Sequence, residues 1–130
     1  MSCNPSIGGV GKGHLVRELD VFDGLMARAA DASAIHRRML NASKGPAVHG
    51  PRVQADRDHY AAAIRRLVAS SGVNVVLGQA VRLVLQSGGV AGVQLADGTL
   101  LRARALVIAT GTFLSASIFC GRDRQSAGRY

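Results

Sequence analysis

The stretch Ala105-Leu106-Val107-Ile108-Ala109-Thr110-Gly111 decides the fold class that this sequence predicts. An uninterrupted apolar run is typical of a strand buried on both faces, because its side chains point alternately to two covered sides of a sheet. The run ends at Thr110 and Gly111, and glycine lets a backbone approach a bound molecule closely. We therefore expect a buried strand whose last residues face a ligand.

Short β-prone runs separated by turn residues precede this strand. The runs cover residues 73–77, 81–85, 90–95 and 100–103, with breaks at Gly78, Ser87-Gly88-Gly89 and Asp97-Gly98. Turn residues at such short intervals favour hairpin connections between neighbouring strands. The segment predicts a small antiparallel β-meander.

Helical patterns fill much of the N-terminal half. Apolar residues recur every three or four positions over residues 13–34, with an interruption at Asp23-Gly24 that indicates two short helices or one kinked helix. Residues 55–70 predict a longer amphipathic helix, with Asp56 near its start and Gly72 as its C-cap. The predicted apolar face of this helix consists of Tyr60, Ala63, Ile64, Leu67 and Val68.

The segment between these helices combines a short strand with turns. Residues 35–40 predict the strand, residues 41–46 a loop, and Gly50-Pro51 a second break. The order of helix, strand, meander and buried strand is typical of the middle of a flavoprotein with two dinucleotide-binding domains. We therefore predict an α/β fold: part of a Rossmann-like FAD domain with an inserted antiparallel β-meander.

A glycine-rich block near the N-terminus carries candidate chemistry. It reads Cys3-Asn4-Pro5-Ser6-Ile7-Gly8-Gly9-Val10-Gly11-Lys12-Gly13-His14-Leu15. Closely spaced glycines expose backbone N–H groups to an anion, and a thiol with a histidine nearby can supply nucleophilic or acid–base chemistry. An ordinary flexible loop is the alternative that the spacing alone leaves open.

The block matches neither of two familiar phosphate-binding motifs. A P-loop needs glycine at the position of Ser6 and a hydroxyl residue at the position of Gly13. The dinucleotide fingerprint would need glycine at the position of His14. Neither nucleotide-binding motif therefore applies, and both an ordinary glycine-rich loop and another kind of ligand loop stay open.

Composition limits the remaining possibilities. The chain has 130 residues, 48% of them hydrophobic, which fits one globular domain. Its net charge of +8 favours phosphate-rich partners such as RNA or nucleotides. Cys3 and Cys120 stand too far apart in sequence to indicate a disulfide framework or a metal site, so we expect no metal. We also expect no membrane association and a reducing, cytoplasmic location.

Three blocks resemble one enzyme family. Residues 1–15, 40–60 and 109–114 are similar to the bacterial and mitochondrial tRNA uridine 5-carboxymethylaminomethyl modification enzymes, the GidA or MnmG family. The resemblance implies an FAD-dependent enzyme that adds a carboxymethylaminomethyl or aminomethyl group to C5 of the wobble uridine of tRNA. It also implies methylenetetrahydrofolate and NADH as co-substrates, an MnmE-type GTPase as partner, a homodimer, and a mitochondrial location if the source is eukaryotic.

Members of this family are several times longer than this chain. We therefore expect residues 1–130 to be a partial FAD-binding domain, without the N-terminal strand and G-x-G-x-x-G loop and without the C-terminal domains. The activity would belong to the full-length protein, and the chain alone is expected to be inactive.

The resemblance implies roles for individual residues. Cys3 would be catalytic, either as a nucleophile at C6 of the uracil ring or as an acid. The residues matched to FAD contacts are Asn4, Ser6, Gly8, Gly9, Val81 (through its backbone), Thr110 and Gly111. The residues matched to a basic block that contacts tRNA or flavin phosphates are Lys44, Arg52 and Arg57.

Two alternatives come from other classes of protein. One is a stand-alone basic RNA-binding module without redox chemistry. The apolar run at residues 105–109 and the low aromatic content of 4% argue against it, because RNA-binding modules display stacking aromatics. The other is a related folate- and FAD-dependent tRNA uridine methyltransferase.

Overall fold

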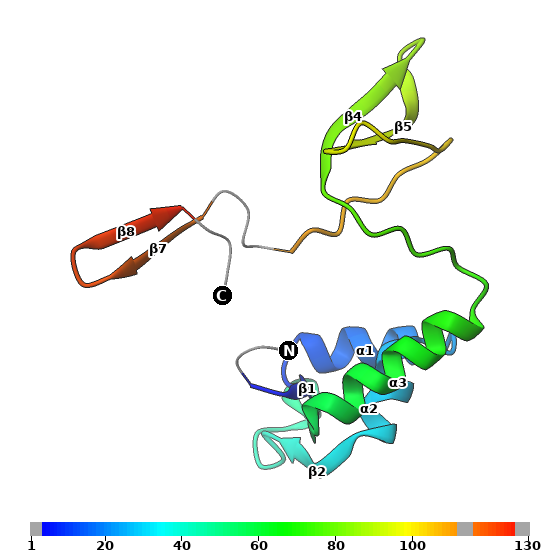
Figure 1. Ribbon diagram of the computed structural model, residues 1–130. Helices are drawn as coiled ribbons and strands as arrows, with labels where there is room; N and C mark the ends of the chain where they lie inside the picture. Colours follow the sequence, from blue (N-terminus) through cyan, green and yellow to red (C-terminus); the bar gives the residue numbers. More distant parts are fainter. Residues whose placement is uncertain (1–3, 112–115, 127–130) are drawn as a thin grey trace. The chain divides into compact units, whose positions relative to one another are not determined.

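The computed structural model describes residues 4–111 and 116–126 of the chain. The chain divides into two compact units, Met1–Val75 and Val76–Tyr130. The first unit combines helices with a sheet, and the second consists of β-structure (Figure 1). The fold is thus mixed α/β with small antiparallel sheets, which confirms the coarse fold class.

A three-stranded antiparallel sheet organises the first unit. Its strands are β1 (Ser6–Gly8), β2 (Ala34–Leu40) and β3 (Gly50–Ala55), in the order β1-β3-β2. Strand β2 confirms the strand predicted at residues 35–40. Strands β1 and β3 were not predicted, because both lie in segments that the glycine and proline content marks as loops.

The central strand β3 accommodates a proline, so the prediction of a break at Gly50-Pro51 was wrong. The Pro51 carbonyl accepts a hydrogen bond from the Gly9 N–H at 2.9 Å. In a β-strand, the backbone nitrogen and the carbonyl oxygen of one residue point toward the same neighbouring strand. The Pro51 nitrogen therefore faces the end of β1, whose pairing stops where Gly8 lies opposite Arg52. The missing N–H costs no bond to β2.

Helices α1 (Lys12–Asp20) and α2 (Leu25–Ala32) pack on this sheet, and α3 (Arg57–Ser70) packs on α2. All three α-helices were predicted, whereas the short 3-10 helix at Pro46–Val48 was not. The break between α1 and α2 falls at Asp23-Gly24, as predicted. The predicted apolar face of α3 is buried or half-buried, and Gly72 follows the helix with φ of 74°. The buried core of this unit consists of small side chains and one isoleucine: Ile7, Ala29, Ala30, Ala55 and Ala63.

Asp56 caps helix α3. Its Oδ1 accepts a hydrogen bond from the His59 backbone N–H at 2.8 Å. This hydrogen bond to the charged form holds the pKa of Asp56 below its ordinary value of 3.8. The carboxylate therefore stabilises the folded chain above pH 3.8, and this contribution is lost as the pH falls through the lowered pKa.

The variant Asp56→Asn tests this cap. Asparagine keeps the acceptor oxygen but removes the charge that the helix N-terminus favours. We expect the wild-type chain to have the higher midpoint of thermal unfolding at neutral pH, measured by circular dichroism. The difference between the two proteins should shrink below about pH 4. A difference that grows on acidification would contradict the sign of the pKa shift.

Three of the four runs predicted as a meander form one in the second unit. Strands β4 (Ala80–Gln86), β5 (Gly89–Leu95) and β6 (Leu100–Arg102) form an antiparallel sheet in the order β4-β5-β6. Ser87 and Gly88 connect β4 to β5 with φ of 51° and 78°, a conformation that suits tight hairpins. In the turn between β5 and β6, hydrogen bonds from Thr99 lower the pKa of Asp97.

Two predicted strands are absent from the structure. Residues 73–77 and 105–109 have extended or irregular backbone and form no ladder with another segment of the described chain. Apart from the half-buried Leu106, their side chains are exposed, with Leu77 at 92% and Val107 at 88%. A strand buried on both faces needs neighbouring strands and covering layers. The described residues supply neither beside these runs, so the prediction of a buried strand at 105–109 was wrong for this chain.

A hairpin that was not predicted follows. It consists of β7 (Ser117–Cys120) and β8 (Asp123–Ser126). The Arg124 guanidinium lies 5.8 Å from the centre of the Phe119 ring, and its Nε donates to the Ser117 hydroxyl oxygen at 3.1 Å. These cross-strand contacts stabilise a short, exposed hairpin.

Candidate functional site

The sheet of the first unit has two chemically different faces. In-register residues Ile7, Val53 and Arg37 share the face on which α1 and α2 pack. Ser6, Gly8, Arg52, Gln54, His36 and Arg38 share the opposite face by strand alternation. The first face is mostly apolar, and the second is polar and basic.

Glycines shape the turn from β1 into α1. Gly8, Gly9 and Gly11 have φ of 125°, 97° and 82°, values that other residues rarely adopt. The Gly13 N–H donates to the Gly9 carbonyl at 2.8 Å, which starts the helix directly after the turn. His14 accepts a hydrogen bond from the Gly11 N–H at its Nδ1, at 3.2 Å. His14 therefore caps α1 through its ring.

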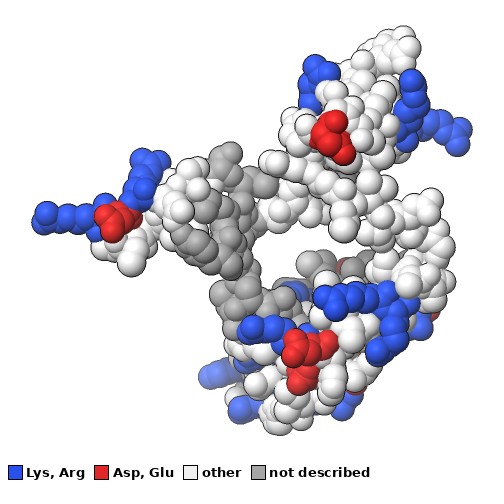
Figure 2. Space-filling model, in the orientation of Figure 1, with Lys and Arg blue, Asp and Glu red and all other residues white. Residues whose placement is uncertain are grey.

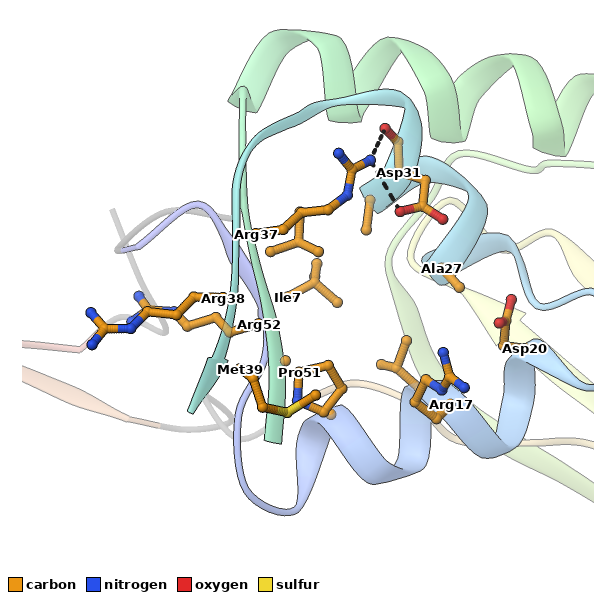
Figure 3. A pocket seen from close by; sticks show the side chains of 15 residues that line it. Ile7, Arg17, Asp20, Ala27, Asp31, Arg37, Arg38, Met39, Pro51 and Arg52 are labelled. Atoms are coloured by element: carbon orange, nitrogen blue, oxygen red, sulfur yellow. Dashed lines mark hydrogen bonds and ion pairs between the residues drawn. The ribbon is translucent and has the colours of Figure 1, made fainter. Parts of the chain in front are cut away.

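A pocket of about 380 Å³ opens between the sheet and the helices α1 and α2 (Figure 3). Ile7, Met39 and Pro51 contribute apolar surface to it. An ion pair at its rim joins Arg37 Nη2 to Asp31 Oδ1 at 3.3 Å. The volume lies within the range of small-molecule sites. Sequence reasoning missed this pocket, because it depends on β1 and β3.

The opposite face carries two arginines side by side. Arg38 of β2 and Arg52 of β3 are directly paired in the sheet register. Both side chains extend away from the helix-side pocket in the same direction (Figure 3). A shallow hollow of about 260 Å³ is lined by His36, Arg38, Leu40, Arg52 and Gln54. Every second residue of β2, from His36 to Leu40, lies on this face, and that alternation could have indicated it. The adjacent strand β3, however, was not predicted.

The structure brings several predicted site residues together. Ser6, Gly8 and Gly9 lie on β1 and the turn after it, and Gly8 pairs with Arg52. Arg52 Nη2 donates to Ser6 Oγ at 3.4 Å. Asn4 precedes β1 and is exposed. The predicted catalytic Cys3 lies outside the described residues.

The other predicted basic residues lie apart from this group. Lys44 is exposed in the loop that follows β2, and Arg57 is the exposed first residue of α3. Basic side chains are spread over both units of the chain (Figure 2). This distribution alone therefore does not identify Lys44 or Arg57 as part of a binding site.

The remaining predicted FAD contacts lie in the second unit. Val81 is an exposed residue of β4, and Thr110 and Gly111 lie in the extended segment after the meander. Gly111 has φ of 78°, and an added Cβ would meet no atom within 4 Å. The contact of Thr110 and Gly111 with FAD stays a prediction.

Within residues 4–111 and 116–126, no group of three or more His, Cys, Asp and Glu is placed to hold a metal ion. Among the described helices, none combines the length and the apolar character that a membrane span requires.

The chain matches a known protein family over its whole length. Residues 1–130 match the family described as glucose inhibited division protein A, and the chain belongs to this family. The structure of GidA from Aquifex aeolicus in its form I crystal superimposes with a TM-score of 0.88 at 37% identity. That match covers 99% of this chain and 22% of the Aquifex chain.

Curated relatives carry a functional name. The chain is 53% identical over 130 residues to the tRNA uridine 5-carboxymethylaminomethyl modification enzyme MnmG of Zymomonas mobilis, covering 21% of its length. It is 50% identical to the MnmG of Thermus thermophilus, covering 22% of that protein. These matches confirm the resemblance. The chain spans about a fifth of the length of these relatives.

Proposed function

We propose that this chain is part of the FAD domain of an enzyme that modifies C5 of the wobble uridine of tRNA. The reaction would add a carboxymethylaminomethyl or aminomethyl group, with methylenetetrahydrofolate and NADH as co-substrates. The observation that carries this proposal is the 53% identity to the Zymomonas mobilis enzyme over 99% of the chain. An MnmE-type GTPase as partner, a homodimer and a cytoplasmic or mitochondrial location belong to the same proposal.

Part of the backbone of the β1 turn is not covered by other described residues. An added Cβ at Gly11 would meet no atom within 4 Å, and one at Gly9 would meet only the Leu40 side chain at 4.0 Å. The residues proposed to contact FAD are Asn4, Ser6, Gly8 and Gly9 in the first unit and Val81, Thr110 and Gly111 in the second. When bound, FAD supplies two-electron redox chemistry. Cys3 would act on the uracil ring as nucleophile or acid.

The exposed apolar runs support the proposed domain. Residues 73–77 and 105–109 carry large apolar side chains, most of which are exposed to solvent in this chain. In a protein about five times longer, further strands can complete a dinucleotide-binding sheet around them. This accounts for strand-like sequences that form no strand in the structure of this chain.

A chimera tests the proposal. In it, this chain replaces the matching segment of the Zymomonas mobilis relative. We expect the purified chimera to show flavin absorbance in the near-ultraviolet and blue. It should also restore the modified wobble uridine, measured by nucleoside mass spectrometry, in a bacterium that lacks the enzyme.

The unaltered relative is the control for expression and thermal unfolding. A chimera that folds as the relative does, yet neither binds flavin nor restores the modified nucleoside, would refute the proposed function.

A further inference from the structure

Among the described residues, Arg38 and Arg52 on the polar face of the sheet have no acidic partner. Arg38 and Arg52 lie directly opposite each other on adjacent antiparallel strands. Like charges in this arrangement destabilise a sheet. The ion pairs of the described chain join Arg28, Arg37 and His59 to acids, and none includes Arg38 or Arg52. The repulsion between the two guanidinium groups is therefore not offset within the described part of the chain.

The surroundings hold one of these arginines in place and leave access to it. Arg52 is half-buried, and its Nη2 donates to Ser6 Oγ at 3.4 Å. The residue beside it on β1 is Gly8, which has no side chain to cover the guanidinium. His36 and Gln54, one step along the same face, add hydrogen-bonding groups to the hollow.

We propose that Arg38 and Arg52 together form a binding site for a phosphate group. One guanidinium fork satisfies a carboxylate by two parallel hydrogen bonds. Two guanidinium groups on neighbouring strands can donate to more oxygens than the two of a carboxylate. A phosphate group provides three or four oxygens and therefore suits the pair better. A bound phosphate would also neutralise the repulsion between the two arginines, so binding would stabilise the sheet.

Arg37, Arg65 and Arg66 do not share this arrangement. Arg37 points to the opposite face and is paired with Asp31. Arg65 and Arg66 are exposed neighbours on α3, and adjacent helix residues do not face each other. Arg65 and Arg66 therefore provide matched control positions with the same charge and no convergent geometry.

The source of the phosphate is either the tRNA backbone or the FAD pyrophosphate. This choice between two sources rests on the proposed function. The phosphate site itself does not, because it is inferred from the positions of Arg38 and Arg52.

Inorganic pyrophosphate tests the site directly. At equal ionic strength, it should raise the midpoint of thermal unfolding of the chain, relative to chloride, by about 5 °C at a concentration tenfold above its Kd. The variants Arg38→Gln and Arg52→Gln should each weaken pyrophosphate binding about 10-fold or more. Without pyrophosphate, Arg38→Gln should unfold at a higher temperature than the wild-type chain, because the repulsion is relieved.

The control variants Arg65→Gln and Arg66→Gln should keep the full pyrophosphate shift. Equal losses in the control variants and in Arg38→Gln would show only general charge attraction and would overturn the proposal. Arg38 is exposed, so its variant remains informative if Arg52→Gln does not fold. No shift in the wild-type chain would also overturn the proposal.

The chimera distinguishes the two sources. If tRNA supplies the phosphate, Arg38→Gln and Arg52→Gln should lower tRNA affinity about 10-fold and reduce its salt slope by about one unit each, with normal flavin content. If FAD supplies it, flavin content should fall and tRNA affinity should hold. Unchanged flavin content together with unchanged tRNA affinity would overturn the biological role of the site. A chimera that does not bind flavin or modify tRNA, with the pyrophosphate shift intact, would refute only the proposed function.

Discussion

Replacing Cys3 by serine in the chimera is expected to abolish modification of the wobble uridine, with turnover reduced about 100-fold or more. The uracil ring is a poor nucleophile at C5 until a group adds at C6, and a thiolate can make that addition. Serine has nearly the same shape, but its hydroxyl is a far weaker nucleophile and acid than a thiol. Flavin content and the midpoint of thermal unfolding should stay close to those of the unaltered chimera.

Cys120 provides the matched control for this experiment. It is an exposed free cysteine at the end of β7, and the resemblance gives it no role in catalysis. Cys120→Ser should therefore leave turnover within a few-fold of the unaltered chimera. If Cys3→Ser also retains turnover within a few-fold, or loses stability instead of activity, then Cys3 is a structural thiol and its catalytic role is refuted.

Periodicity predicted the elements that local sequence signals specify. The helices α1, α2 and α3 and the meander β4-β5-β6 follow apolar spacing and turn residues, which act locally. Residues 105–109 carry an equally clear pattern, but a buried strand also depends on neighbours from elsewhere. The described chain provides none, so the pattern alone could not determine the structure there.

The candidate site was harder to predict than the elements around it. Gly50-Pro51 has the composition of a turn, yet it belongs to strand β3. The strand tolerates Pro51 because its pairing with β1 stops before Pro51, so the missing N–H leaves no hydrogen bond unmade. Without β3, the sequence gives no register between Arg38 and Arg52 and no helix-side pocket. Arg52 was identified through the resemblance, whereas Arg38 became a candidate only through the observed pairing.

Replacing Gly8 by alanine is expected to destabilise the first unit strongly. An added Cβ would overlap the Pro51 carbonyl oxygen and lie 2.6 Å from the Arg52 Cα. Both are backbone atoms of the central strand, so neither can move without shifting β3. The φ of 125° at Gly8 adds conformational strain for any residue with a side chain. Overpacking and strain together predict a loss of about 3 kcal/mol or more in the free energy of unfolding.

The variant Gly9→Ala separates steric overlap from backbone strain. Gly9 also has a positive φ, of 97°, but an added Cβ there would meet only the Leu40 side chain at 4.0 Å. Strain alone predicts a loss of about 1–2 kcal/mol. Urea unfolding of the chain, followed by circular dichroism, measures both variants. Because β1 carries Ser6 and flanks Arg52, Gly8→Ala should also reduce the pyrophosphate-dependent rise in unfolding temperature, whereas Gly9→Ala should preserve it. Equal losses of stability in the two variants would show that β1 does not approach β3 as closely as the structure places it.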